Sequence, residues 1–132
     1  MKKGNRGFTL VEIMIVVAII ALLAAIAIPN LLRAKISAND ALAKGSLRSL
    51  STASETFATS NNGNYPGDMT SLTTGATPPY INSNPCLAIP TSGFNYTCTV
   101  GTGGYTFIAT PATVGTTGTT TFTMSTGGVL TP

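Results

Sequence analysis

The carboxylate of Glu12 stands where it requires a chemical partner. It lies in an otherwise apolar run from Phe8 to Ile28 that contains no other charged residue. Inserting a carboxylate near the centre of a membrane-spanning helix costs about 2.5–3.5 kcal/mol, and less near the end of the helix, where Glu12 stands. Because a charge in such surroundings usually has a partner, we expect a cation to reach Glu12 from outside the run.

The two cysteines, Cys86 and Cys98, offer a second kind of chemistry. They are the only cysteines of the chain, so one intramolecular disulfide is possible. The N-terminal sequence predicts export to an oxidising compartment, which favours the disulfide. Closing so short a loop would stabilise the fold by on the order of 3 kcal/mol. Two buried free thiols are the alternative.

Catalytic chemistry is not expected from this chain. The sequence contains no histidine, which excludes Ser–His and Cys–His catalytic pairs. The phosphate-binding pattern G-x-x-x-x-G-K-[ST] is also absent. Of the four carboxylates, none follows Asp68, so acidic metal ligands are few. We predict a protein that is not an enzyme and that has no cofactor and no metal site.

The apolar run predicts a membrane-spanning helix. From Phe8 to Ile28 it would be about 31 Å long, which matches a bilayer core of roughly 30 Å. The basic leader MKKGNRG precedes it, so the positive-inside rule keeps the leader cytoplasmic and exports the remainder. A secretory signal cleaved near Ala25-Ile26-Ala27 is an alternative that conflicts with the length of the run and with Glu12. A plain membrane anchor is another, but it leaves Glu12 unexplained.

The segment Gly7–Glu12, GFTLVE, follows the short leader and precedes an apolar stretch that ends at Pro29. This arrangement resembles the N-terminus of short-leader, type IVa-like prepilins, in the family of type IV pilins and type II secretion pseudopilins. The resemblance implies that a prepilin peptidase with methyltransferase activity cuts between Gly7 and Phe8 and then N-methylates Phe8. It also implies that Glu12 meets the new α-amino group of Phe8 on a neighbouring copy, which forms a charge-assisted pair.

The same resemblance implies a structural role, as the subunit of a type IV pilus filament that polymerises with copies of itself through its N-terminal helix. Before assembly the chain would lie in the bacterial inner membrane as a single-pass protein with its C-terminus outside the cytoplasm. An inner-membrane assembly platform and its ATPase would then extract it into a cell-surface pilus. A minor pilin or adhesin that acts as a binding module, and a monomeric anchored domain, stay open as alternatives.

The major pseudopilin of a type II secretion system is a further alternative. Such pseudopilins typically hold calcium through carboxylates near the end of the domain. Here no charged residue follows Asp68, which favours a pilus subunit.

The formal charge of +3 belongs to the leader. Removing its three cations leaves four basic residues against four carboxylates, so the mature side chains sum to zero. Near-zero charge favours self-association. Since no cation follows Arg48, we expect no nucleic-acid binding.

The chain is predicted to be one exported domain of the α+β class. We expect a long N-terminal helix, half transmembrane and half amphipathic, packed on a small antiparallel β-sheet of three to four strands. The expected segments are the leader 1–7, the transmembrane or filament-core helix 8–29, the amphipathic helix 30–61, a variable connecting loop 62–93 and the sheet region 94–132.

Local patterns within the helix give three further expectations. Pro29 removes one backbone hydrogen bond, which predicts a kink or local opening. Asp40 and Lys44 are four residues apart and are expected to pair weakly. Apolar residues at steps of 3, 4 and 7 predict a stripe that packs on the sheet. That stripe comprises Leu32, Ile36, Ala43, Leu47, Leu50 and Phe57.

Alternation of apolar and polar residues predicts the strands. The alternating sets are Phe94, Tyr96, Cys98 and Val100, then Tyr105, Phe107 and Ala109, then Phe122 and Met124, and Val129-Leu130 is a further strand signal near the end of the sequence. Glycine-rich turns separate these sets, so we expect an antiparallel meander.

Overall fold

A computed structural model describes residues 7–87 and 89–132 of the chain. It has a long helix, a short 3-10 helix and four strands: α1 Leu10–Ser60, η1 Thr70–Leu72, β1 Phe94–Gly101, β2 Gly104–Pro111, β3 Phe122–Ser125 and β4 Val129–Thr131. The chain divides into two compact units, of which the first ends at Ala34 and the second begins at Lys35. The predicted α+β class, with a long N-terminal helix and an antiparallel sheet, is confirmed.

The first unit contains the N-terminal part of α1, which is exposed on all sides. Its large apolar side chains between Leu10 and Ile28 are 50–75% exposed. By length and composition, α1 contains a stretch able to cross a membrane. An apolar helix with no buried face is typical of a segment that is covered by lipid or by other helices.

Pro29 lies inside α1, and the helix continues past it. Proline has no N–H, so one carbonyl in the preceding turn loses its usual partner. The Nδ2 of Asn30, the next residue, donates to the carbonyl of Ile26 at 3.1 Å and adds a donor in this turn. The kink at Pro29 stays a prediction.

The sheet in the second unit has the strand order β1-β2-β3-β4, with every neighbouring pair antiparallel. Cys98 of β1 lies opposite Phe107 of β2, which in turn lies opposite Met124 of β3. Burial alternates along β2, as its sequence pattern predicted. The result is the expected meander, in which each strand pairs with the next one along the chain.

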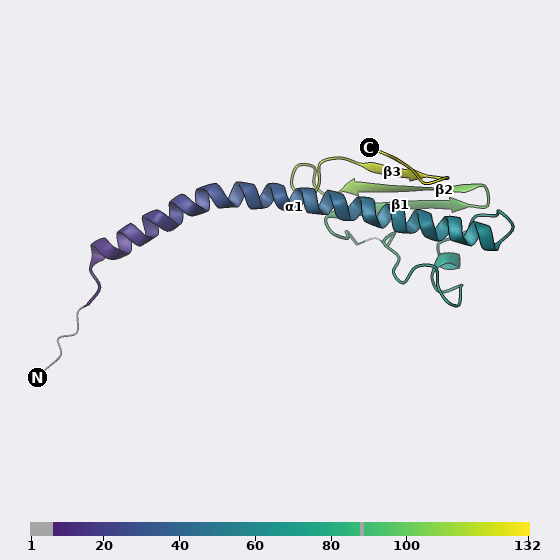
Figure 1. Cartoon of the computed structure of the whole chain (residues 1–132), viewed down its shortest axis with the longest axis horizontal. Coiled ribbons are helices and arrows are strands. Elements are labelled where there is room, and N and C mark those ends of the chain that lie inside the picture. Colours follow the sequence, from purple (N-terminus) through teal and green to yellow (C-terminus); the bar gives the residue numbers. More distant parts are fainter. Residues whose placement is uncertain (1–6, 88) are drawn as a thin grey trace, which may run out of the picture. The chain divides into compact units, whose positions relative to one another are not determined.

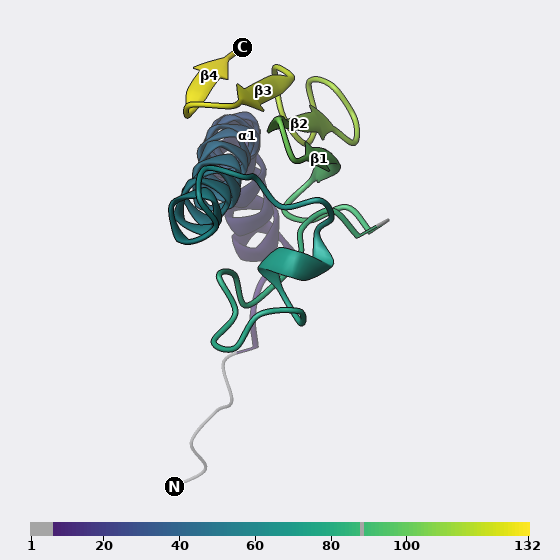
Figure 2. The same cartoon turned by 90° about the vertical axis from the view of Figure 1, so that its right-hand side faces the viewer.

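The core lies between this sheet and the part of α1 beside it (Figure 1). Viewed along α1, the strands curve over one side of the helix, and the loop that contains η1 lies on another side (Figure 2). The helix contributes Ala43, Leu47 and Leu50, and the sheet contributes Phe94, Tyr96, Tyr105, Phe107, Ala109, Phe122 and Met124. Burying one such large side chain contributes about 1.5–3 kcal/mol.

The predicted helical stripe is wrong at its N-terminal end. Leu32 is 45% exposed, and the fully buried positions of α1 begin at Ala43. The buried set also includes small residues, Ala53, Ser54 and Ala58, that an apolar pattern does not single out. Small side chains let loop and sheet approach the helix closely, which hydrophobic periodicity alone does not reveal.

The expected pair between Asp40 and Lys44 is also corrected. The Oδ1 of Asp40 accepts a hydrogen bond from the backbone N–H of Thr119 at 3.1 Å, and its Oδ2 accepts one from the Thr119 hydroxyl at 2.6 Å. The Nζ of Lys44 instead lies 4.7 Å from the centroid of the Phe122 ring. An exposed helical ion pair is worth only a few tenths of a kcal/mol, so these tertiary partners outweigh it.

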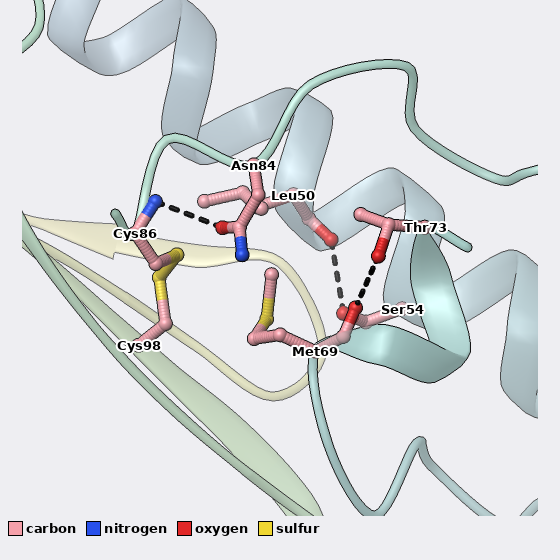
Figure 3. Close-up of a disulfide and its surroundings, with 7 residues drawn as sticks. All are labelled: Leu50, Ser54, Met69, Thr73, Asn84, Cys86 and Cys98. Atoms are coloured by element: carbon pink, nitrogen blue, oxygen red, sulfur yellow. Dashed lines mark hydrogen bonds between the residues drawn. A yellow bond between two sulfur atoms is a disulfide. The ribbon is translucent and has the colours of Figure 1, made fainter. Parts of the chain in front are cut away.

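The predicted disulfide between Cys86 and Cys98 is present (Figure 3). It joins the long connecting loop to β1, and both half-cystines pack against the core. The Oδ1 of Asn84 accepts the backbone N–H of Cys86 at 2.9 Å, which fixes the loop just before the bond. The disulfide therefore fastens the loop to the edge strand of the sheet.

Candidate functional site

The site begins at the peptide bond between Gly7 and Phe8, which precedes α1 and is not helical. Phe8 is 85% exposed, and beyond the chain neighbours of Gly7 no heavy atom of the described residues lies within 4 Å of the position that a Cβ on Gly7 would occupy. A peptidase must bind its substrate in an extended form, so a bond just ahead of the first helical turn is available to such an enzyme.

The first turn of α1 is closed by a reciprocal pair of hydrogen bonds between Thr9 and Glu12. The Oε2 of Glu12 accepts the backbone N–H of Thr9 and the Thr9 hydroxyl, each at 2.8 Å. The Thr9 Oγ1 in turn accepts the backbone N–H of Glu12 at 3.2 Å. This is a capping box, in which the two side chains satisfy backbone donors that the helix leaves unpaired.

The cap leaves Glu12 with the capacity for a further partner. Both hydrogen bonds fall on Oε2, and within the described residues no donor reaches Oε1. A carboxylate can accept at both oxygens. Glu12 therefore combines a fixed orientation with one oxygen that is available to a cation.

Thr9 was missed as a site residue from the sequence, although a signal for it exists. A Ser or Thr followed three residues later by an acidic residue, ahead of an apolar run, is the sequence signature of a capping box. Thr9-Leu10-Val11-Glu12 fits it.

The structure brings together only some of the predicted site residues. Gly7 and Phe8 lie just before the Thr9–Glu12 cap, and Pro29 lies further along the same helix. Cys86 and Cys98 belong to the second unit and form no part of the site.

A second polar cluster surrounds Glu55, near the end of α1. Its Oε1 accepts the Tyr105 hydroxyl and the backbone N–H of Gly127, each at 2.9 Å, and its Oε2 accepts the Tyr65 hydroxyl at 3.0 Å. The Tyr105 hydroxyl also lies 2.7 Å from the Ser51 Oγ. Tyr65, Tyr105 and Gly127 are 10, 50 and 72 residues from Glu55 in the chain, so no local sequence pattern could have indicated the cluster.

Glu55 is ionised over a wider pH range than usual because of this cluster. Partial burial by itself would raise the pKa of Glu55, but the hydrogen bonds from Tyr105, Gly127 and Tyr65 outweigh it and bring the pKa below 4.5. The hydrogen bond to Glu55 raises the pKa of Tyr65, so that hydroxyl stays a donor. The cluster fastens both the connecting loop and the β3–β4 turn to α1.

Glu55→Gln is expected to destabilise the second unit by about 1–2 kcal/mol at pH 7, because the charged acceptor of three hydrogen bonds is lost. A carboxyl group whose pKa is lowered by folding stabilises above its unfolded pKa, and that stability is lost as pH falls through the folded pKa. The difference in stability between wild type and variant should therefore be fully present above pH 4.5 and should shrink as the pH falls below it. Thermal unfolding of both proteins across pH 2–8 checks this.

Two tyrosines supply a matched control for that experiment. Tyr105→Phe removes one hydrogen bond to Glu55 and should reduce the pH-dependent part of the stability. The Tyr96 hydroxyl is buried and, among the described residues, has no hydrogen-bond partner. Tyr96→Phe should leave the pH profile unchanged, and a profile shifted as much as in Tyr105→Phe would contradict the assignment to the Glu55 cluster.

Comparison with known proteins finds a family match at the N-terminus and relatives that align with part of this chain. Residues 2–28 match the family described as the prokaryotic N-terminal methylation motif. The type IV major pilin protein PilA of Myxococcus xanthus is 55% identical over 53 residues, which is 40% of this chain and 24% of the relative. The type IV wide pilus major component PilA4 of Thermus thermophilus is 45% identical over 60 residues, 46% of each protein.

A third relative belongs to a secretion system. The type II secretion system core protein G of Pectobacterium carotovorum is 36% identical over 81 residues, which is 61% of this chain and 51% of the relative. The chain thus spans between about a quarter and a half of the length of these curated relatives. No solved structure matches the chain significantly. The methylation motif matched by residues 2–28 and these relatives make the chain similar to type IV pilins and type II secretion pseudopilins.

Proposed function

We propose that this protein is the structural subunit of a type IV pilus filament, and that it polymerises through the apolar part of α1. The observation that carries the proposal is an apolar helix whose large apolar side chains between Leu10 and Ile28 are exposed and whose first turn holds the carboxyl group of Glu12 with one available oxygen. Such a surface is stable only in lipid or against other helices. The match of residues 2–28 to the N-terminal methylation motif and the similarity to proteins named as major pilins support this proposal.

The subunit is a substrate of processing. A prepilin peptidase cuts between Gly7 and Phe8 on the cytoplasmic side of the inner membrane and then methylates the amino group of Phe8. The exposed, non-helical position of this bond ahead of α1 supports the cut. The methylation motif matched by residues 2–28 supports the modification.

Gly7→Ala is expected to trap the precursor, because a methyl group added at Gly7 would meet the peptidase in its fitted site, while no described atom of the chain beyond the neighbouring residues lies within 4 Å of it. Processing should fall at least about tenfold, as expected when an added methyl group costs 1.4 kcal/mol or more in a fitted enzyme site. Mass spectrometry of the membrane fraction would show the leader still attached and Phe8 unmethylated. Gly45→Ala, on an exposed face of α1, is the control and should be processed normally. Unchanged processing of Gly7→Ala would rule out the cut.

Assembly then moves the helix from lipid into the filament. Before assembly the apolar span lies in the inner membrane, with the sheet outside the cytoplasm. An assembly platform driven by an ATPase then extracts the subunit from the membrane. On entry, the available oxygen of Glu12 binds the α-amino group of Phe8 on a neighbouring copy. Pairing removes an unpaired charge from an apolar environment, which favours the assembled state.

A secretion pseudopilus is the second candidate. The alignment with the secretion protein G covers more of this chain than either alignment with a major pilin. The two functions require different machinery, so deletion of the gene should affect either surface filaments or protein secretion. Loss of surface filaments with normal protein secretion supports the pilus, and loss of secretion supports the pseudopilus.

A further inference from the structure

We propose that Arg48 of one copy binds Asp68 of a neighbouring copy in the filament, with the Asp68 turn of the neighbour lying against a hollow beside α1. The inference rests on the proposed function, because it needs an assembly of identical subunits. It names the contact between the folded second units, whereas Glu12 and Phe8 concern the apolar part of α1.

The distribution of charge leaves few residues for such a contact. No charged residue follows Asp68, so the sheet has no ionic groups to offer a neighbour. Two carboxylates of the second unit are already bound within the chain. Asp40 binds Thr119, and Glu55 binds Tyr65, Tyr105 and Gly127. Asp68 is the remaining carboxylate of this unit.

Asp68 is exposed and held in a fixed orientation. Its Oδ1 accepts hydrogen bonds from the Thr70 hydroxyl at 2.6 Å and from the N–H and hydroxyl of Ser71 at 2.8 and 2.9 Å. These bonds lower the pKa of Asp68, so the group is ionised at neutral pH. In the described part of the chain no donor reaches Oδ2, which leaves one oriented oxygen on the surface.

Arg48 borders a hollow that is open to solvent. The hollow has a volume of about 370 Å³ and lies between α1 and the connecting loop. Its lining includes Arg48, Thr52 and Thr56 from the helix, and Tyr80 and Ile81 from the loop. Arg48 is exposed, and its planar guanidinium is suited to carboxylate binding.

The two residues suit a contact between copies better than one within a copy. Within the described residues, all hydrogen bonds to Asp68 come from its own turn, and no ion pair joins it to Arg48. A filament forms when a subunit presents two different, complementary patches, since a self-complementary patch closes a dimer instead. The Arg48 hollow and the Asp68 turn are two such patches of opposite charge, and the charge complementarity fixes the register of the neighbours.

Crosslinking tests the contact without changing either charge. Thr52→Cys places a thiol in the Arg48 hollow, and Gly67→Cys places one beside Asp68, where an added Cβ meets no atom within 4 Å. Purified filaments of the double variant, treated with a short bismaleimide, should give a ladder of covalent multimers on a denaturing gel. The native cysteines are joined to each other and do not react. Ala38→Cys with Gly67→Cys is the matched control and should give no ladder.

Charge exchange tests the energetics. Arg48→Asp and Asp68→Arg should each lower filament yield about tenfold or more, because like charges then face each other. The combined exchange should restore most of the yield, whereas Lys35→Asp with Asp68→Arg should not. The Tm of the detergent-solubilised subunit, measured for each variant, separates lost assembly from lost folding.

The outcomes distinguish this contact from the function on which it rests. Intact filaments without a ladder, or a ladder of equal strength from the Ala38→Cys control, would overturn the Arg48–Asp68 contact and leave the filament proposal standing. Failure of the charge exchange to restore yield in well-folded protein would also overturn it. Absence of filaments from wild type would overturn both.

Discussion

Filament yield from a Glu12→Gln variant is expected to fall about a hundredfold or more, while the amount of protein in the membrane stays the same. Glutamine keeps the size and the acceptor oxygen of the side chain but removes its charge. Losing one partner of an ion pair that is buried in an apolar environment costs about 3–5 kcal/mol. Neutralising Glu12 also makes the span more apolar, so insertion should not suffer. Electron microscopy of sheared surface filaments, with immunoblots of the membrane fraction, measures both quantities.

The cap between Thr9 and Glu12 allows charge and capping to be separated. Glutamine at the third helical position can still complete a capping box, so Glu12→Gln preserves this local role. Thr9→Val does the reverse, because it removes the hydroxyl that binds Glu12 and leaves the carboxylate in place. Losing a cap costs about 1 kcal/mol. Filaments should survive in Thr9→Val and be lost in Glu12→Gln. The opposite ranking would show that Glu12 acts as a helix cap and not as an ion-pair partner.

Gly118→Ala is expected to destabilise the second unit by about 2–3 kcal/mol, which lowers Tm by about 10 °C. Gly118 lies in the buried part of the β2–β3 connection. An added Cβ would clash with the Phe94 ring and come within 3.0 Å of the Asp40 Oδ1. Phe94 is fully buried, so its ring has little room to move. Thermal unfolding by circular dichroism measures the loss.

Gly45→Ala is the matched control for that substitution. Gly45 is exposed on α1, and outside its own helical turn no atom of the described residues lies within 4 Å of the position of an added Cβ. Alanine is favoured over glycine in a helix by up to about 1 kcal/mol, so this variant should gain stability. If both variants lost stability to the same extent, the clash with Phe94 would not be the cause.

The sequence predicted the features that depend on local pattern. The apolar run predicted the first part of α1, alternation predicted the strands, and a pair of cysteines in an exported domain predicted the disulfide. Each of these signals lies within a few neighbouring residues, or depends on there being only two residues of a kind.

The sequence did not predict the features that depend on where distant segments meet. Asp40 binds Thr119, 79 residues away, rather than Lys44 one turn away. Glu55 gathers donors from three segments. The apolar periodicity predicted a buried stripe as far as Leu32, because such periodicity can continue along a helix where no other element covers the helix. Such contacts are set by the path of the chain in three dimensions, which a single sequence does not reveal.

The two carboxylates that fasten the sheet to α1 have a mechanical consequence. Asp40 binds the connection between β2 and β3, and Glu55 binds Tyr105 and the turn between β3 and β4. They are 15 residues apart, roughly 22 Å along the helix. Tension applied along α1 therefore reaches the sheet at two separated points at once and loads their hydrogen bonds together. We therefore expect the sheet to separate from the helix only when both sets of hydrogen bonds break.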